Sequence, residues 1–130
     1  MDARGLLLLA GLLSCLLWGQ AAPAASHSPV RNVKYGAIAM DRDSKAIGYS
    51  YDFISSRDAK REALRLCGTD NCEVLVSIRN ACGVVAEGKT VADGKTKLWT
   101  ETGATRQEAQ TKVLRQCGKG CPILAWACTR

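Results

Sequence analysis

Cysteine is the residue type that most clearly indicates chemistry in this sequence, because the 130-residue chain contains seven cysteines. Cys15 falls in an apolar segment near the start, and six cysteines follow it: Cys67, Cys72, Cys82, Cys117, Cys121 and Cys128. An even number of cysteines in a small exported chain indicates disulfides. Zinc sites usually use closer cysteine spacing in a reducing compartment, and redox catalysis would need a C-x-x-C motif, which this chain lacks.

The cysteine spacing suggests which residues are joined. One cysteine closes a predicted helix and the next opens the following strand, first in the pair Cys67 and Cys72 and then in the pair Cys117 and Cys121. A tight helix-to-strand turn can bring such positions within bonding reach. Cys82 and Cys128 then pair by exclusion, although six cysteines permit other connectivities.

The elements that position these cysteines occur twice. A unit of about 48 residues repeats over residues 35–81 and 82–130. Tyr49-Ser50 is echoed by Trp99-Thr100, and the helix and cysteine pattern recurs at eight positions. The first copy of that pattern is Ser55, Asp58, Ala59, Ala63, Leu64, Cys67, Gly68 and Cys72, and the second is Thr105, Glu108, Ala109, Val113, Leu114, Cys117, Gly118 and Cys121.

Each copy predicts the order β-β-α-β. In the first copy, period-two alternation and turn residues place strands at 35–40, 46–53 and 73–79, and capping signals place a helix at 57–67. In the second copy the strands fall at 83–87, 96–101 and 122–128. We therefore predict a two-layer α+β domain with a mainly antiparallel sheet, two helices and disulfide staples.

The N-terminal segment is typical of an export signal. An apolar run ends in small residues, so we expect residues 1–24 to be a signal peptide, 25–34 a flexible tail and 35–130 a single domain. A lipoprotein anchored through Cys15 is an alternative, but the apolar run continues past that cysteine. The mature protein is expected to be periplasmic or secreted, without a stable membrane span.

The charge is basic, with 18 Lys and Arg against 12 Asp and Glu, a net +6. A basic surface favours anionic partners without choosing among them. Tyr49, Tyr51 and Phe53 alternate along one strand face, which we interpret as core packing, so nucleic acid is a disfavoured partner. The candidate anion-binding face on the two helices is Lys60, Arg61, Arg65, Arg106, Lys112 and Arg115.

The last strand of each copy has two faces that are both rich in apolar residues. We expect one face to pack against the helices, and its residues are Val74, Val76, Ile78, Ile123, Ala125 and Ala127. On the other face we predict a surface for a protein partner or for a homodimer. Burial under the 88–96 loop is the alternative, and the candidate residues are Leu75, Arg79, Leu124 and Trp126.

Catalytic machinery is not evident in the sequence. The single histidine, His27, lies in the predicted tail, away from any held nucleophile. Asp52, Glu73 and Glu101 lie on predicted strands and could act as an acid and base pair only if two of them met. We predict no catalytic residue, no cofactor, no metal site and no enzymatic activity.

Several segments together resemble the bacterial family called domain of unknown function 4189. The similarity covers about residues 35–130 and is carried by Tyr35-Gly36-Ala37-Ile38-Ala39, Gly48-Tyr49-Ser50, Cys67-Gly68, Cys72, Asn80-Ala81-Cys82-Gly83 and Leu124-Ala125-Trp126-Ala127-Cys128. The resemblance implies a small, exported, disulfide-bearing protein without an assigned general activity, and it contributes no catalytic residues. Residues 97–101 are more polar than the family pattern.

We therefore expect an exported binding module that acts by contact with a protein partner, as an inhibitor, an immunity partner or a secreted effector. One alternative is a small hydrolase or binder of an anionic polymer such as nucleic acid or cell wall. Another alternative is a structural envelope protein.

Overall fold

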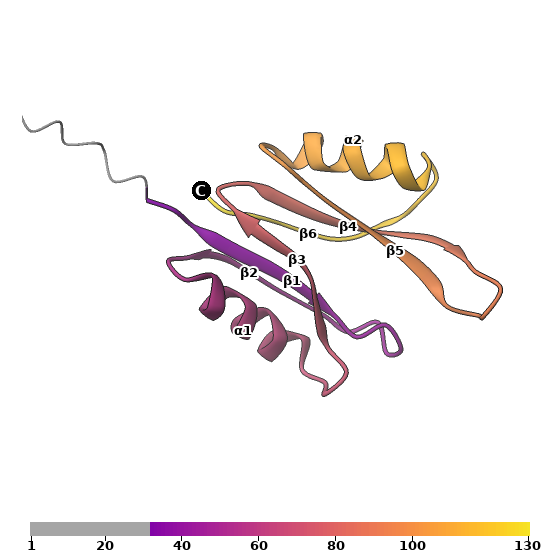
Figure 1. Ribbon diagram of the computed structural model, residues 1–130, viewed down its shortest axis with the longest axis horizontal. Helices are drawn as coiled ribbons and strands as arrows, with labels where there is room; N and C mark the ends of the chain where they lie inside the picture. Colours follow the sequence, from indigo (N-terminus) through magenta and orange to yellow (C-terminus); the bar gives the residue numbers. More distant parts are fainter. Residues whose placement is uncertain (1–31) are drawn as a thin grey trace, which may run out of the picture. The chain divides into compact units, whose positions relative to one another are not determined.

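The computed structural model describes residues 32–130, and two helices and six strands lie in this range. The predicted signal peptide, Cys15, His27 and most of the predicted tail lie outside the described residues. The elements are β1 (Tyr35–Met40), β2 (Ile47–Phe53), α1 (Ser56–Cys67), β3 (Glu73–Arg79), β4 (Cys82–Thr90), β5 (Thr96–Gly103), α2 (Arg106–Cys117) and β6 (Ile123–Cys128). The predicted β-β-α-β order and the α+β class are confirmed (Figure 1).

Each repeat forms a three-stranded antiparallel sheet with one helix on it (Figure 1). The strand order is β2-β1-β3 in the first sheet and β5-β4-β6 in the second. Small residues allow each helix to lie close to its sheet: Ala59 and Ala63 of α1 are buried, as are Ala109 and Val113 of α2. The two-layer arrangement therefore describes each half of the molecule.

The two sheets pack against each other through the faces that the helices leave uncovered. The core between them consists of Ile38, Val76, Ile78, Val85 and Ala127. The approach is close, because a Cβ atom added to Gly83 would lie 2.8 Å from Cγ1 of Ile78. A side chain at position 83 would therefore force Ile78 to shift within the core between the sheets.

An extra residue in β3 and in β6 changes which face the rest of each strand occupies. Ile38 pairs with Val76 while Ala39 pairs with Val74, so Leu75 is the extra residue in β3. Leu124 is the extra residue in β6, where Val85 pairs with Ala125 and Ala86 with Ile123. Such a bulge reverses the in-and-out alternation beyond it.

The bulges correct part of the sequence prediction. Val74 and Ile123 pack beneath the helices as expected. The expectation that four further residues face the helices is wrong, because these residues belong to or pack against the core between the sheets. They are Val76, Ile78, Ala125 and Ala127.

Side-chain caps fix where the helices begin. Ser55 Oγ accepts a hydrogen bond from the Asp58 amide at 3.4 Å, and Thr105 Oγ1 accepts one from the Glu108 amide at 3.1 Å. These bonds satisfy amides that have no partner within the helix. α1 ends at Cys67 and is capped by Gly68, whose φ of 83° is a left-handed conformation that suits glycine. The capping signals in the sequence thus located α1, predicted at 57–67, to within one residue, and Thr105 was correctly predicted as the cap of the second helix.

The position of α1 on its sheet depends on Gly48. A Cβ atom at this residue of β2 would lie 2.0 Å from the Ala63 carbonyl oxygen and 2.2 Å from the Cys67 amide nitrogen. Any side chain at position 48 would therefore push the helix away from the strand. Next to it, Ser50 Oγ donates to the Ala59 carbonyl at 2.6 Å and accepts from the Ala37 amide at 3.1 Å, which ties helix and sheet together.

All three predicted disulfides are confirmed. Cys67–Cys72 and Cys117–Cys121 each close a helix-to-strand turn, with Cα atoms 6.2 Å and 6.1 Å apart. Cys82–Cys128 joins directly paired residues of β4 and β6 across a sequence separation of 46 residues.

The three disulfides should contribute unequally to stability. Replacing Cys82 and Cys128 together by alanine should lower the free energy of unfolding by about 4 kcal/mol, against about 2 kcal/mol for Cys117 and Cys121, because the longer loop restricts the unfolded chain more. Urea unfolding of the two oxidised double variants and the wild type measures the difference. An equal loss, or a larger loss from the short loop, would contradict this account.

Candidate functional site

A groove of about 680 Å³ runs between β2 of the first sheet and β6 of the second. This size is within the range of about 300–1,000 Å³ that is typical of ligand sites. Both strands are edge strands, so each of them has one side without a neighbouring strand in its own sheet. The groove is lined by Ile47, Tyr49, Tyr51, Asp52, Leu124, Ala125, Trp126, Ala127, Cys128 and Arg130.

Two tyrosines of β2 are exposed in this groove. Tyr49 pairs with Ile38 of β1, and directly paired residues point to the same face, so Tyr49 lies on the face that meets the second sheet. Tyr49 is nevertheless 49% exposed and Tyr51 57% exposed. The expectation that these side chains pack in the core is therefore wrong. The second sheet covers only part of edge strand β2, and strand alternation alone does not reveal this.

Trp126 borders the groove from β6. It pairs with Val84 of β4, which faces α2. The Arg106 guanidinium of α2 lies 4.0 Å from the centroid of its ring, a cation–π contact, and the residue remains 43% exposed. An indole held by an arginine keeps one orientation and still offers contact surface.

Asp52 and Arg130 close one end of the groove. The Arg130 amide donates to Asp52 Oδ1 at 2.8 Å, which joins the residues after β6 to β2. Asp52 has a φ of 61°, in the left-handed region that aspartate tolerates better than most residues. The irregularity next to it, between Tyr35 and Ala37 of β1, interrupts the pairing of the two strands, which resumes where Tyr35 pairs with Phe53.

The duplication gives this groove a counterpart. We call the contact between β2 and β6 the first seam, and the contact between β5 and β3 the second seam. Register defines the equivalent residues. Tyr49 pairs with Ile38 as Thr100 pairs with Val85, and Tyr51, two residues further on, corresponds to Thr102. By the same reasoning Trp126 corresponds to Ser77.

The two seams differ in chemistry although they share a backbone plan. Two tyrosines and a tryptophan of the first seam are replaced in the second by two threonines and a serine. The second seam shows that the fold forms with small polar side chains at these positions. The aromatic residues of the first seam are therefore not required by the architecture, and this marks the first seam as the candidate functional site.

Aligning the two repeats by sequence gives β2 a register that differs by one residue from the register of the structural alignment. The sequence echo matched Tyr49 with Trp99, but Trp99 pairs with Ala86 and packs beneath α2. Its structural equivalent is Gly48, which pairs with Ala39. A shift of one residue exchanges the two faces of a strand, so the echo could not reveal the aromatic difference between the seams.

The four residues predicted as a partner surface have different surroundings. Leu75 and Leu124 are the bulge residues, and both pack against the core between the sheets. Arg79 is exposed at the end of β3. Of the predicted set, Leu124 and Trp126 line the groove.

The basic residues of the predicted anion-binding face lie on two helices that cover different sheets (Figure 1). Three of them bind a neighbouring acid on the same helix: Arg61 with Asp58, Arg65 with Glu62 and Lys112 with Glu108. Hydrogen bonding from Arg65 and from Lys112 lowers the pKa of Glu62 and of Glu108 respectively. Within residues 32–130, Lys60, Arg106 and Arg115 form no ion pair.

The three strand carboxylates considered for acid and base chemistry have separate partners. Asp52 accepts from Arg130, Glu73 binds Arg42 and Glu101 accepts from Gln116. Asp52 and Glu73 lie at opposite ends of the first sheet. Glu101 belongs to the second sheet.

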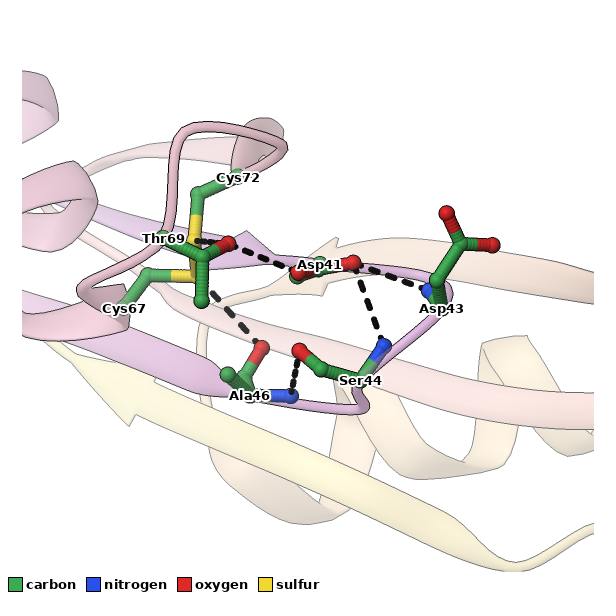
Figure 2. Close-up of a disulfide and its surroundings, with 7 residues drawn as sticks. All are labelled: Asp41, Asp43, Ser44, Ala46, Cys67, Thr69 and Cys72. Atoms are coloured by element: carbon green, nitrogen blue, oxygen red, sulfur yellow. Dashed lines mark hydrogen bonds between the residues drawn. A yellow bond between two sulfur atoms is a disulfide. The ribbon is translucent and has the colours of Figure 1, made fainter.

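A buried carboxylate outside the groove joins the first hairpin to a disulfide loop (Figure 2). Asp41 Oδ2 accepts from Thr69 Oγ1 at 2.7 Å, and Asp41 Oδ1 accepts from the Asp43 and Ser44 amides at 2.9 Å and 3.2 Å. Thr69 belongs to the loop closed by Cys67–Cys72, and its Oγ1 lies 3.2 Å from Cys72 Sγ. The Thr69 hydroxyl, followed by Ser44 and the Asp43 amide, lowers the pKa of Asp41 to about 2.

Sequence comparison identifies the family to which this chain belongs. Residues 35–128 match the family described as "Domain of unknown function (DUF4189)", so the chain belongs to this family. Protein Rv1269c of Mycobacterium tuberculosis and Protein Mb1300c of Mycobacterium bovis are each 34% identical over 94 residues, covering 72% of this chain and 68% of the relative.

Structural comparison gives the same fold. The NMR structure of Rv1813c from Mycobacterium tuberculosis matches with a TM-score of 0.56 and 28% identity, over 98% of this chain and 99% of that chain. The family match over residues 35–128 confirms the resemblance seen in the sequence. Among residues 32–130, no helix is both long and apolar enough to cross a membrane.

The Asp41 contacts predict an acid-dependent loss of stability. A carboxyl with a pKa of about 2 in the folded chain and about 3.8 when unfolded stabilises the fold above pH 3.8, and this stabilisation disappears as the pH falls toward 2. In Thr69→Val, the pKa of Asp41 should rise toward 3.8, as measured by carbon-13 NMR titration of the carboxyl group. Thr111→Val, which removes an exposed hydroxyl from α2, is the control. An unchanged Asp41 pKa in Thr69→Val would refute the role of this hydroxyl.

Proposed function

We propose that this protein is an exported binding module that acts by contact with a protein partner, as an inhibitor, an immunity partner or a secreted effector, and that it performs no catalysis. The observation that carries the proposal is the difference between the two seams. The first seam places Tyr49, Tyr51 and Trp126 where the second has small polar residues. Aromatic side chains that the fold does not need support a role in recognition.

The residue types at the first seam suit a protein interface. Tyrosine, tryptophan and arginine are the residues most enriched among those that dominate binding energy. Trp126 is already oriented by Arg106, so less side-chain freedom is lost when a partner binds. The disulfides hold the helix-to-strand corners, which further reduces the ordering cost.

Export is supported by two observations. Three disulfides in about 100 residues are typical of proteins that fold in an oxidising compartment. The N-terminal sequence also has the composition of a signal peptide, with an apolar run followed by small residues. We infer that the protein is periplasmic or secreted.

One observation favours a second candidate function, the binding of an anionic polymer. The net charge is +6, and exposed tyrosines beside arginine can stack on the bases of single-stranded nucleic acid. Three of the helix cations are already bound to acids on the same helix, which reduces the charge that the predicted face offers to a polymer. We therefore rank this candidate second.

Exchanging the seam residues tests the proposal. The variant Tyr49→Thr, Tyr51→Thr, Trp126→Ser gives the first seam the residues of the second, so it should keep the fold. It should reduce capture of a stoichiometric protein partner at least tenfold, because the aromatic contacts are lost. The measurement is a pull-down from envelope and secreted fractions of the producing organism with the oxidised mature protein, quantified by mass spectrometry.

A matched control removes three exposed apolar residues that do not line the groove, in the variant Ile54→Thr, Leu66→Ser, Val91→Thr. This control should capture the partner as well as the wild type does. Fluorescence anisotropy with a single-stranded oligothymidine tests the second candidate. If the seam variant captured the partner as well as the control variant and the wild type do, the first seam would be refuted as the site. Tight binding of oligothymidine by the wild type that is lost in the seam variant would favour the polymer.

A further inference from the structure

The backbone of β2 offers unpaired hydrogen-bonding groups beside the groove. The Asp41 amide donates to the Ala46 carbonyl at 2.9 Å, so these two residues occupy a hydrogen-bonded position of the ladder, although the Ala46 amide donates to Ser44 Oγ and does not return the bond. In an antiparallel ladder such pairs alternate with pairs whose N–H and C=O groups point away from the neighbouring strand. Following the register from this pair, the backbone groups of Ile47 and Tyr49 point outward, to the edge that has no neighbouring strand.

The side chains of the same residues face the groove. Ile47 packs against the core between the sheets, and Tyr49 lines the groove in front of β6. A chain that paired with β2 would therefore meet backbone donors and acceptors at the edge and aromatic side chains on the adjoining face. Both are needed when a peptide adds a strand to a sheet.

The strands of the first seam lack the charges that usually protect sheet edges. Residues 47–51 and 123–128 contain no charged residue, whereas β5 carries Lys97 and Glu101, and β3 carries Glu73 and Arg79. Proteins commonly block an edge strand with charged side chains, proline or a bulge. The strands of the second seam carry such charged side chains, whereas β2 has none before Asp52.

Charge indicates what kind of chain can occupy the edge. Arg130 lines the groove, and Arg106 lies over the ring of Trp126 at its border. Asp52, the one acid among the described lining residues, already accepts a hydrogen bond from the Arg130 amide. The net charge of +6 opposes association with a second copy of the protein. An acidic chain is complementary to this surface.

We propose that an extended, acidic segment of a partner protein binds by adding to β2 as a new edge strand of the first sheet, with alternate side chains in the groove. This inference rests on the proposed function and specifies how the first seam recognises its partner. Backbone pairing supplies affinity, and Tyr49, Tyr51 and Trp126 select the side chains that fit.

Amide hydrogen exchange followed by NMR tests this binding mode on the oxidised protein. The probe is a pool of ten-residue synthetic peptides in which glutamate alternates with Val, Ile, Tyr or Phe. The amides of Ile47 and Tyr49 should exchange fast in the free protein and at least tenfold more slowly with the pool. A pool with lysine in place of glutamate should bind at least tenfold more weakly, and N-methylation at alternate positions should abolish the protection.

A pair of variants isolates the backbone contribution. Tyr49→Thr removes the ring and keeps the N–H group, while Tyr49→Pro removes both from an edge position where proline is tolerated. Loss of the outward hydrogen bond should make Tyr49→Pro bind the glutamate pool about tenfold more weakly than Tyr49→Thr. If Tyr49→Pro does not fold, the N-methylated pool still decides the question.

Other outcomes overturn the proposal in distinguishable ways. Resonance shifts at groove side chains without protection of the two amides would retain the first seam as a binding site and refute strand addition. Protection that appears with protein concentration alone would identify a second copy as the occupant. If the glutamate pool at millimolar concentration caused neither amide protection nor resonance shifts, binding of an acidic strand would be refuted. The proposed function would still hold in that case if capture of the partner depended on the seam residues.

Discussion

The close packing of the two sheets is the interaction on which the rest of the structure depends. Each half has one helix and three strands, and the fully buried residues between helix and sheet are alanine, valine and cysteine, which are small. The larger side chains Ile38, Ile78 and Val85 meet between the sheets. Neither half could therefore bury enough surface alone, and the duplication is a condition of folding rather than an addition to it.

Two local features accommodate this packing. Gly83 leaves room for Ile78, which a side chain at position 83 would displace. The bulges at Leu75 and Leu124 divide the apolar residues of β3 and β6 between two cores. Before each bulge the apolar residue faces the helix, and after it the apolar residues face the other sheet. One strand can thus contribute to two cores.

Packing two equivalent halves face to face creates two equivalent seams, and their edge strands differ in residue type. At the second seam the edge strands carry charged residues and threonines, as expected for edges that are meant to stay free. At the first seam the edge strands are uncharged over most of their length and carry exposed aromatic residues. The duplication thus provides an internal comparison, in which one copy shows what the fold requires and the other shows what has been added.

Sequence reasoning succeeded where the signal is local. Ser55, Thr105 and Gly68 mark the helix ends through backbone chemistry, and the cysteines at each helix-to-strand turn are close in sequence, so their pairing could be predicted. It failed where the answer depends on distant strands. The alternation in β2 correctly placed Tyr49 on an inner face, but only the extent of the opposing sheet decides whether an inner face is covered. The bulges give no sequence signal, because Leu75 and Leu124 are ordinary strand residues.

The distribution of charge connects stability to recognition. An uncharged edge strand invites pairing with any exposed strand, and a protein at high local concentration would pair with itself. A net charge of +6 opposes such self-association through repulsion between copies. The same charge attracts acidic chains and therefore favours acidic partners at long range, before any contact forms.

The helix cations contribute to this attraction even when they are bound to neighbouring acids, provided that the net charge of the molecule stays positive, whereas the exposed tyrosines act only at contact. Attraction and fit are thus assigned to different residues, so the site can keep an apolar character without losing its preference for an acidic partner.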